Sequence, residues 1–365
     1  MRVQLITVLT LAVLISGTRA AAAEPAAPAP TPPPVAAPGS AVSELRSQAA
    51  AITPLLTTDA AGHFVRAAAS LPAITARTLH VNKQTRSWFT PAERAMLAPE
   101  VQAGLTEVVR DESFYYNTRY GTPLAYARAF ELLAAQPGLG KTFQNWHGKR
   151  ILDYGYGTIG HLRLLATCGA HVVGIDTDAS LVKLYSDPGD TGTIKGWTPS
   201  EASHPTPDGS IRLITGRFPV DPGCTPQEST GPDGGFDLFI SKNTLKNGYI
   251  HPAEPVDKRM LVDLGTSEAE YLKALFAVLK PGGVAMIYNI CPAPAKPGEK
   301  YIPWADGRSP FSREQWEAAG FEVVAIDESD NTAMRAMARA LGWDKDGMKL
   351  DDDLFVWWTL VRRRG

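Results

Sequence analysis

The stretch 151–176, ILDYGYGTIGHLRLLATCGAHVVGID, contains a cluster of three glycines whose spacing suits the binding of a ligand. Gly155 and Gly157 allow the backbone to turn tightly and to approach a ligand, and Gly160 lets the following helix pack closely. Asp176 ends the next apolar run, 21 positions after Gly155, where a carboxylate can accept both hydroxyls of a ribose. A purely structural turn is the alternative, but the strand and helix expected around it favour an adenosine site.

Asp153 distinguishes between the ligands that carry adenosine. It lies two residues before Gly155, at the carboxyl end of the expected strand, where open parallel sheets bind ligands. A buried carboxylate there would repel the pyrophosphate of a dinucleotide but would suit an ammonium group. S-adenosylmethionine carries adenosine, an ammonium and a sulfonium without a phosphate, so we expect it as the cofactor. The residues predicted to bind it are Asp153, Gly155, Gly157, Gly160, Asp176 and Thr177.

From residue 149 onward, strand patterns alternate with helical patterns. Strands are expected at 150–155, 170–176, 210–216, 236–241, 282–290, 321–327 and 354–361, which are rich in β-branched and aromatic residues. Helices are expected at 161–169, 267–283 and 312–320, and the last opens with Ser312 and Gln315 in capping-box spacing. This alternation predicts an α/β fold in residues 149–365, with a mostly parallel, doubly wound, seven-stranded sheet covered on both faces.

Residues 40–148 show helical patterns that proline and glycine interrupt. The patterns cover 40–56, 90–109 and 122–136. Thr90 is the expected N-cap of the second, with Pro91 at its first position and Glu93 in capping-box spacing. We therefore expect an N-terminal helical layer on the sheet and not a second enzyme.

The first 39 residues are of a different character. Arg2 precedes an apolar run of 13 residues and then small residues suited to cleavage, so 1–23 is predicted to be a signal peptide. The run is short for a membrane span, which needs about 20 residues, so no span is expected after cleavage. Residues 24–39 hold seven prolines and indicate a linker. The protein is expected to be exported, to a periplasm, or to be cytoplasmic if its N-terminus is misassigned.

Composition excludes several classes of protein. The net charge is −2, from 36 basic and 38 acidic residues, so nucleic acid is not an expected partner. The three cysteines are too few and too scattered for a disulfide framework or a zinc site, and no metal is expected.

Five motifs in order resemble the class I S-adenosylmethionine-dependent methyltransferases, over roughly residues 112–362. They are DYGYGTIG (153–160), VVGIDTD (172–178), FDLFISKNTL (236–245), LKPGG (279–283) and EAAGFEVV (317–324). The resemblance implies a Rossmann-like methyltransferase domain, in which Asp176 holds the cofactor ribose, and an exported branch of that family. The chain departs from the family at Arg217, where an acid often contacts the adenine, and Asp221 is a candidate substitute.

The residues after the fourth expected strand should face the transferred methyl. Methyl transfer is an in-line displacement, so an enzyme mainly positions the acceptor and excludes water. Lys242, Asn243 and His251 are the predicted catalytic residues, with His251 as a general base. His251 bonded to a loop backbone, and Lys242 paired with a carboxylate, are the alternatives. Lys246 and Tyr249 belong to the same segment, and Tyr249 is expected to bind substrate.

Two further segments are candidates for covering the site. The aromatic stretch 114–123 is expected to place Arg119 and Tyr120 against the substrate, whereas Tyr115 and Tyr116 suit packing between the helices and the sheet equally well. Tyr288 is expected to bind substrate and precedes the loop 291–310. This loop is either a lid or solvated; its polar and aromatic residues are Tyr301, Trp304 and Asp306.

The leading hypothesis is methyl transfer from S-adenosylmethionine to a small or envelope-associated acceptor. An exported, non-catalytic cofactor-binding protein on the same fold is the second, because S-adenosylmethionine is made in the cytoplasm. An NAD-dependent oxidoreductase is the third; it fits the 21-residue spacing but not Asp153 or LKPGG.

Overall fold

The computed structural model describes residues 39–117, 120–202, 204–225 and 234–365. The predicted signal peptide (1–23), the linker up to residue 38, and Arg119 therefore lie outside the described residues. The described residues belong to one compact unit, Pro34–Gly365.

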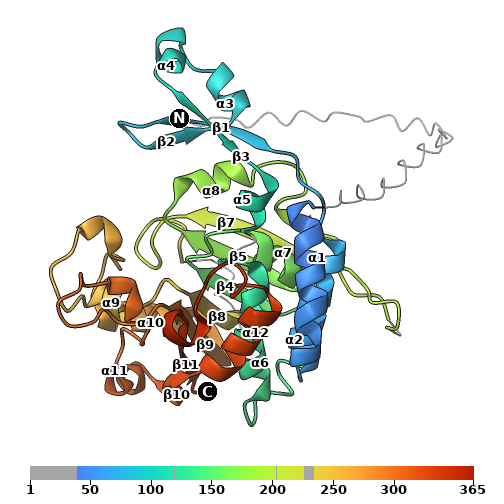
Figure 1. The fold of residues 1–365 in the computed structure, drawn as a ribbon, viewed down its shortest axis with the longest axis vertical. Helices are drawn as coiled ribbons and strands as arrows, with labels where there is room; N and C mark the ends of the chain where they lie inside the picture. The colour runs from blue at the N-terminus through green and yellow to red at the C-terminus, as the bar shows by residue number, and fades with distance from the viewer. Residues whose placement is uncertain (1–38, 118–119, 203, 226–233) are drawn as a thin grey trace, which may run out of the picture. The chain divides into compact units, whose positions relative to one another are not determined.

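Eight strands form the central sheet (Figure 1). They are β4 Arg150–Tyr154, β5 His171–Asp176, β6 Gly192–Ile194, β7 Gly209–Thr215, β8 Phe236–Lys242, β9 Leu279–Cys291, β10 Phe321–Ser329 and β11 Phe355–Arg363. Their order is β10-β11-β9-β8-β4-β5-β7-β6. The five from β9 to β7 run parallel, β11 is antiparallel to β9 and β10, and β6 is antiparallel to β7.

The predicted α/β class with a mostly parallel sheet is confirmed, but the predicted count of seven strands is wrong. The eighth strand, β6, is only three residues long and holds no apolar run that a sequence pattern could detect. The LKPGG stretch lies within β9 and not before it. It forms a bulge there, because the partner of Phe236 is Leu279 while that of Leu238 is Val284.

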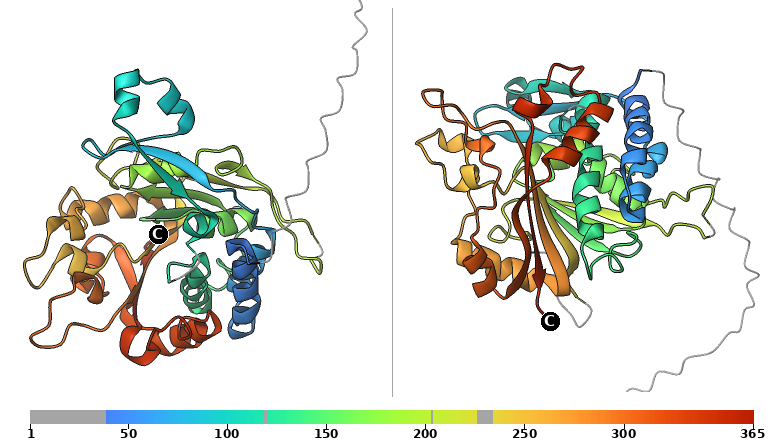
Figure 2. Two further views of the ribbon diagram at one scale, coloured as in Figure 1. Left: turned by 45° about the horizontal axis from the view of Figure 1, so that its top comes forward. Right: turned by 60° about the horizontal axis from the view of Figure 1, so that its bottom comes forward.

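Helices cover both faces of the sheet (Figure 2). Side chains from α1 Ala41–Ile52, α2 Asp59–Arg66, α6 Tyr126–Ala135, α7 Gly160–Thr167 and α12 Asn331–Ala340 form one apolar core with one face. Side chains from α10 Glu268–Val278 and α11 Arg313–Ala318 form a second core with the other. Ile240 and Tyr288 belong to the core on the α6 face, and residues paired across neighbouring strands lie on the same face of a sheet. Asp153, the partner of Ile240, and Lys242, the partner of Tyr288, therefore also lie on the α6 face.

The N-terminal region is helical only in part. Residues 77–110 contain an antiparallel sheet of order β2-β1-β3, with β1 Arg77–Asn82, β2 Ser87–Phe89 and β3 Thr106–Arg110. The helix expected over 90–109 is wrong as a single element: it comprises α3 Pro91–Ala95, α4 Pro99–Ala103 and then β3. Pro99 starts a new helix, and the β-branched TEVVR pairs with β1. The capping boxes at Thr90 and Ser312 are confirmed.

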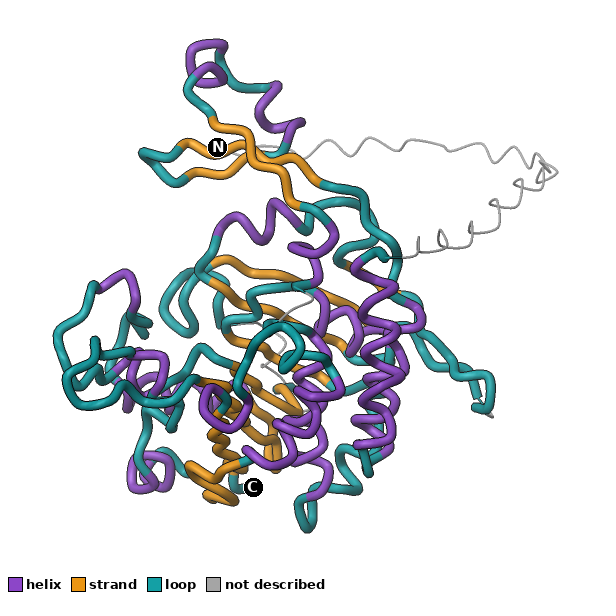
Figure 3. Tube along the Cα trace, viewed as in Figure 1, coloured by secondary structure: helices purple, strands orange, loops and turns teal. Residues whose placement is uncertain are grey.

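The remaining helices are short and connect these layers. They are α5 Glu112–Tyr116, α8 Ala179–Leu184, α9 Asn247–Ile250 and α13 Leu350–Asp353. Long loops surround α9 (Figure 3). None of the helices in the described ranges is long and apolar enough to span a bilayer.

Candidate functional site

The turn between β4 and α7 holds its glycines in conformations that other residues rarely adopt. Gly155 has φ +78° and Gly157 has φ +59°, both in the left-handed region. A Cβ atom on Gly157 would meet nothing within 4 Å, whereas one on Gly160 would lie 3.0 Å from Pro123. The turn therefore offers open space at Gly157 and close packing at the start of α7.

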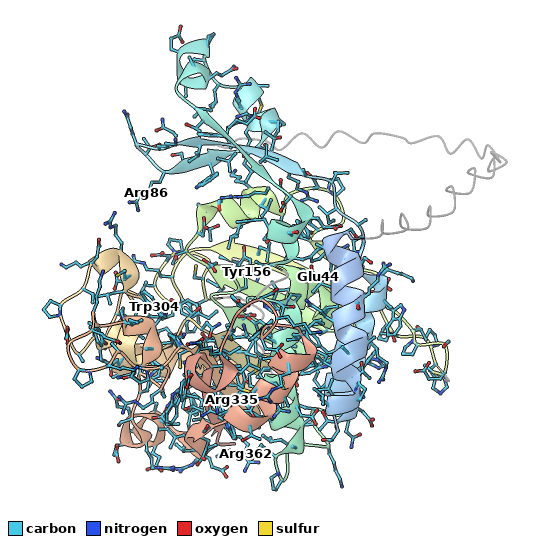
Figure 4. All side chains as sticks on the ribbon, viewed as in Figure 1. Glu44, Arg86, Tyr156, Trp304, Arg335 and Arg362 are labelled. Atoms are coloured by element: carbon cyan, nitrogen blue, oxygen red, sulfur yellow. The ribbon has the colours of Figure 1, made fainter. Side chains whose placement is uncertain are left out.

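Tyr156, between the two glycines, is buried, and its label in Figure 4 lies over the centre of the fold. A Cβ atom on Gly174 in β5 would lie 2.8 Å from the Tyr156 ring, so the ring rests on the backbone of the sheet. The surface above Gly157 is thus free of the neighbouring aromatic side chain.

The Asp176 carboxylate is held against the glycine turn. Its Oδ2 accepts a hydrogen bond from the Gly157 N–H at 3.0 Å, and its Oδ1 accepts one from the Asp178 N–H at 2.9 Å. Burial raises the pKa of Asp176, although the two backbone donors oppose that shift. Each oxygen keeps a lone pair with which a ribose hydroxyl could bond.

A cavity of about 290 Å³ opens beside this turn, at the carboxyl ends of the parallel strands. Small-molecule pockets span about 300–1,000 Å³, so this one is at the lower limit. Its lining residues are Tyr154, Gly155, Asp176, Thr177, Arg217, Thr244, Leu261, Val262 and Asp263.

Arg217 and Asp221 are paired at the edge of this cavity. Arg217 Nη2 lies 3.1 Å from Asp221 Oδ1, its backbone N–H donates to Asp221 Oδ2 at 2.9 Å, and Nη1 lies 3.0 Å from Asp263 Oδ2. Both oxygens of Asp221, the candidate adenine contact, are therefore engaged by Arg217.

A larger cavity of about 800 Å³ lies at the opposite ends of the strands, beside Arg150, His171 and Ser210. These residues are near the starts of β4, β5 and β7. Open parallel sheets bind ligands at the carboxyl ends of their strands, so the smaller cavity is the better candidate site.

Four buried polar residues form a cluster behind the turn: Asp153, His161, Tyr126 and Lys242 are 0%, 1%, 4% and 7% exposed. Asp153 Oδ2 lies 2.5 Å from His161 Nε2, and the Tyr126 hydroxyl also interacts with the carboxylate, while Asp153 Oδ1 has no hydrogen bond of good geometry in the described part of the chain. The His161 and Tyr126 rings stack at 3.8 Å between centroids. The Lys242 Nζ lies 5.1 Å from the centre of the Tyr126 ring. These residues place one carboxylate and one ammonium in the same buried region.

Burial dominates the titration of this cluster. It lowers the pKa of Lys242 to about 8; the neighbouring Lys246 lowers it further and Asp153 opposes the shift. It also lowers the pKa of His161, against the attraction of Asp153, and raises the pKa of Tyr126. Strongly shifted groups of this kind are frequent at functional sites.

Lys246 is also buried, but its ammonium has hydrogen-bond acceptors within the protein. Its Nζ donates to the carbonyl of Ile290 at 2.7 Å and to that of Trp304 at 3.2 Å. Burial lowers its pKa to about 8 as well. Lys242 has no hydrogen-bond acceptor among the described residues, so of the two lysines it is the one available to a ligand.

Asn243 and Asn289 join the ends of β8 and β9. The Asn243 N–H donates to Asn289 Oδ1 at 3.0 Å, and Asn243 Oδ1 accepts from the Ile290 N–H at 2.7 Å. Asn243 has φ +66°. Tyr288, in the same strand, is buried and donates to Asp330 Oδ2 at 2.9 Å. The Asn243 Oδ1, both polar side-chain atoms of Asn289 and the Tyr288 hydroxyl are thus bonded within the protein.

His251 lines a separate cavity of about 390 Å³. Its Nε2 lies 3.0 Å from Glu268 Oε1 and 3.2 Å from the Pro310 carbonyl. Tyr249 is half-buried, with Lys246 Nζ 5.7 Å from its ring centre. The predicted group of Lys242, Asn243 and His251 is therefore not brought to one cavity.

The aromatic stretch before α6 packs mainly within the protein. Tyr115 donates to Asp190 Oδ1 at 2.7 Å and Tyr116 donates to the Pro72 carbonyl at 2.8 Å, so both have the packing role. Tyr120 is 41% exposed and its ring meets Trp343 edge-on at 5.6 Å.

The loop 291–310 lies against α9. Tyr301 accepts from the Ala253 N–H at 3.1 Å, and Asp306 pairs with Arg308 at 2.7 Å. Trp304 is 37% exposed and is labelled in Figure 4. With Trp357 the loop lines a cavity of about 570 Å³, apart from the glycine turn.

Three residues of the site are absent from the sequence-based candidates: Tyr126, His161 and Thr244. A Cβ atom on Gly155 would lie 1.9 Å from Thr244 Oγ1, which explains why this position requires glycine. His161 carries a local signal, since it is a polar residue in the first turn of the helix after Gly160. Tyr126 carries none, because only the packing of α6 on the sheet brings it to the site.

No group of three or more His, Cys, Asp or Glu side chains that could hold a metal ion occurs in the described ranges. Cys168, Cys224 and Cys291 are buried free thiols.

No family model and no curated protein matches the chain. Among solved structures, the [4+2]-cyclase SpnF is 18% identical, with 65% of this chain and 80% of that chain covered and a TM-score of 0.36. A putative sarcosine dimethylglycine methyltransferase from Galdieria sulphuraria is 14% identical, with 65% and 86% covered and a TM-score of 0.35.

A Haemonchus contortus N-methyltransferase, in complex with phosphomonomethylethanolamine and S-adenosylhomocysteine, is 14% identical. The match covers 72% of this chain and 63% of that chain, with a TM-score of 0.34.

Proposed function

We propose that the protein binds S-adenosylmethionine at the glycine turn and transfers its methyl group to a small or envelope-associated acceptor. The observation that carries the proposal is the cavity bounded by Gly155, Asp176 and Thr177, with the buried Asp153 two residues before Gly155 in β4. When bound, S-adenosylmethionine supplies an electrophilic methyl group on a sulfonium.

The residues at the turn fit the two halves of this cofactor. Asp176 and Thr177 would hold the ribose, and the open space at Gly157 permits close approach of the ligand. The unpaired Oδ1 of buried Asp153 is an acceptor for an ammonium group. The protein's own contribution to the reaction is to orient the acceptor and to exclude water.

Of the three residues proposed as catalytic, Lys242 has the strongest support. It is buried beside Asp153 and has no hydrogen-bond acceptor among the described residues. The oxygen of the Asn243 side chain is bonded to the Ile290 N–H, and His251 lines another cavity. A role for His251 as general base would require an acceptor that reaches both cavities.

A non-catalytic binding protein is the second proposal, and one observation favours it. Two buried lysines, Lys242 and Lys246, lie at and just after the end of β8, and buried positive charges in this segment disfavour a cationic sulfonium nearby. NAD is less well supported, because the Gly157 N–H that could donate to a pyrophosphate already donates to Asp176.

Calorimetric titration with S-adenosylmethionine, S-adenosylhomocysteine and NAD tests the proposal. We expect binding of the first two and not of NAD, and we expect Asp176→Ala to weaken binding by ~1–3 kcal/mol, through loss of hydrogen bonds to a charged group. Transfer of labelled methyl to an acceptor pool would distinguish the enzyme from the binding protein. Binding of NAD alone would refute both proposals.

The proposal of export to the periplasm is independent of the site. A fusion of residues 1–40 to a reporter active only outside the cytoplasm should give a signal. The mature protein should begin between Ala21 and Glu24 by mass spectrometry, and an intact cytosolic chain starting at Met1 would contradict export.

A further inference from the structure

We infer that Asp153 and Lys242 together form a subsite for a zwitterionic α-amino-acid group: Asp153 Oδ1 accepts its ammonium and Lys242 Nζ donates to its carboxylate. This inference rests on the proposed function, since that group is one end of S-adenosylmethionine. It adds Lys242 as a residue that recognises the carboxylate.

The Asp153 carboxylate is only half satisfied. One oxygen bonds to His161, and the neighbouring Tyr126 hydroxyl also interacts with the carboxylate, but the second oxygen is buried without a hydrogen bond of good geometry in the described chain. A buried acceptor without a hydrogen bond is costly, typically by about 1–3 kcal/mol, so natural structures seldom retain one without a use. The missing partner is a donor, and next to a carboxylate a cationic donor is favoured.

Lys242 lacks an acceptor, whereas Asp153 lacks a donor. Its ammonium is buried over the Tyr126 ring, which supplies cation–π attraction but no hydrogen-bond acceptor. Its neighbour Lys246 donates to two carbonyls, so burial of lysine in this region does not by itself leave the ammonium unpaired. Burial lowers the pKa of Lys242 to about 8, because the ammonium has lost water without gaining an anionic partner. A bound carboxylate would supply that partner.

The two groups are placed to act on one ligand. Asp153 and Lys242 lie near the carboxyl ends of the adjacent strands β4 and β8, with their side chains on the α6 face. Gly155 and Thr244, two positions after Asp153 and Lys242 in the chain, line the cavity beside Asp176. A ligand whose ribose rests on Asp176 would therefore lie against Gly155 and Thr244, next to the ends of the two strands that carry the pair.

Only a group with both charges satisfies both residues. A simple cation would leave Lys242 unpaired, and a simple anion would be repelled by Asp153. No ion pair joins Asp153 and Lys242 within 4.0 Å among the described salt bridges, so they do not neutralise each other directly. His161, Lys246 and Asp176 are the other titratable groups that interact with them, and each already has its own partner.

Calorimetry on the wild-type protein tests the subsite without any substitution. The ligands are S-adenosylhomocysteine, its decarboxylated analogue, which keeps the amine, and 5′-methylthioadenosine, which lacks the whole amino-acid group. We expect S-adenosylhomocysteine to bind at least tenfold more tightly than either of the other two. Equal affinity of S-adenosylhomocysteine and 5′-methylthioadenosine would overturn the subsite and leave the proposed function standing. Failure of all three to bind would overturn both.

Two matched variants assign the carboxylate contact to one lysine. Lys242→Met should lose the preference for S-adenosylhomocysteine over its decarboxylated analogue, while its affinity for 5′-methylthioadenosine stays within twofold of wild type. Lys246→Met removes an equally buried ammonium and should keep the preference. If Lys242→Met instead binds S-adenosylhomocysteine more tightly than wild type does, Lys242 competes with the ligand for Asp153 and the inference is wrong.

Discussion

At the scale of single residues, Gly157 combines a left-handed backbone with open space beside the ligand cavity. Its φ of +59° excludes most side chains on steric grounds, and nothing within 4 Å would meet a Cβ atom there. The left-handed backbone is required by the turn itself, whereas the open space would be required by a bound ligand. A substitution that tolerates the backbone but fills the space separates the two.

Gly157→Asn is such a substitution, because asparagine adopts left-handed φ more readily than other residues. We expect the free energy of unfolding to fall by about 1 kcal/mol or less, and the affinity for S-adenosylhomocysteine to fall at least tenfold. The control is Gly282→Asn, at φ +75° and also with nothing within 4 Å, in the LKPGG bulge. It should bind normally, and normal binding by Gly157→Asn would mean that the turn is structural.

Lys242 gives a prediction about stability and pH. Its pKa is about 8 in the folded protein, against about 10.4 in an unfolded chain. Between these values unfolding takes up a proton, so the stability of the wild type rises as pH increases from 8 to 10. The shift corresponds to roughly 3 kcal/mol at most.

Lys242→Met removes this contribution. The variant should be more stable than wild type at pH 7, and the difference should shrink as pH approaches 10. Urea denaturation at several pH values measures it, with Lys273→Met, an exposed lysine of α10, as the control. A Lys242→Met protein that is less stable at pH 7 would show that the ammonium makes a favourable contact when protonated.

At the scale of elements, Asn243 fastens the end of β8 to β9. Asn243→Ala leaves the Ile290 N–H without its acceptor and places alanine at φ +66°. We expect a loss of about 2–4 kcal/mol in the free energy of unfolding, from the lost hydrogen bond and the strained backbone together. Asn243→Gly relieves the strain and should recover about 1 kcal/mol of this loss. If the two variants reduce methyl transfer while stability is unchanged, Asn243 acts on the substrate instead.

Asp190 attaches the small N-terminal sheet to the central fold. It accepts from Arg77 Nη2 of β1 at 3.1 Å and from the Tyr115 hydroxyl of α5 at 2.7 Å, and it is 2% exposed. Without Asp190, the largely buried Arg77 would keep the exposed Asp187, 3.3 Å from its Nε, and this exposed carboxylate compensates the buried charge less well.

Asp190→Ala should therefore cost about 3–5 kcal/mol and should accelerate amide hydrogen exchange in β1 and β3. The control is Lys183→Ala. Its ion pair with Glu93 joins α8 to α3, with both side chains about a third exposed. That variant should lose about 1 kcal/mol or less. Equal losses in the two variants would mean that the pair buried at Asp190 has no special role in attaching the sheet.

At the scale of the whole molecule, the sequence predicted the elements that have a local pattern, and it did not predict those that depend on contacts between distant segments. Apolar runs in the sequence are sufficient to predict strands β4, β5, β8, β10 and β11. The glycine turn and Asp176 form a motif within 26 residues of sequence. β6 has no apolar run, and the pairing of β1 with β3 joins residues that are 25 to 33 positions apart in the sequence. The cluster of Tyr126, His161 and Lys242 depends on how α6 packs across the sheet, which no local pattern encodes.

The same packing makes the N-terminal helices part of the central fold. One apolar core runs from α1, α2 and α6 to the sheet face that contains Ile151, Ile240 and Met286. Polar contacts reinforce it: Trp146 Nε1 donates to the Ala60 carbonyl at 2.9 Å, and Arg128 pairs with Asp330 at 2.7 Å. Without α6, this face of the sheet and one side of the buried cluster would be exposed to water.

We therefore expect residues 149–365 alone not to fold as a stable unit, and residues 39–365 to unfold in a single cooperative transition. Near-ultraviolet circular dichroism and thermal melting measure both, and coincident transitions by tryptophan fluorescence and far-ultraviolet circular dichroism test cooperativity. Adding residues 39–148 as a separate chain should restore tertiary structure to the fragment, since the missing apolar surface would again be covered. If residues 149–365 alone melt cooperatively within a few degrees of the longer chain, the helices are an appendage. The buried cluster would then have to hold its geometry without Tyr126.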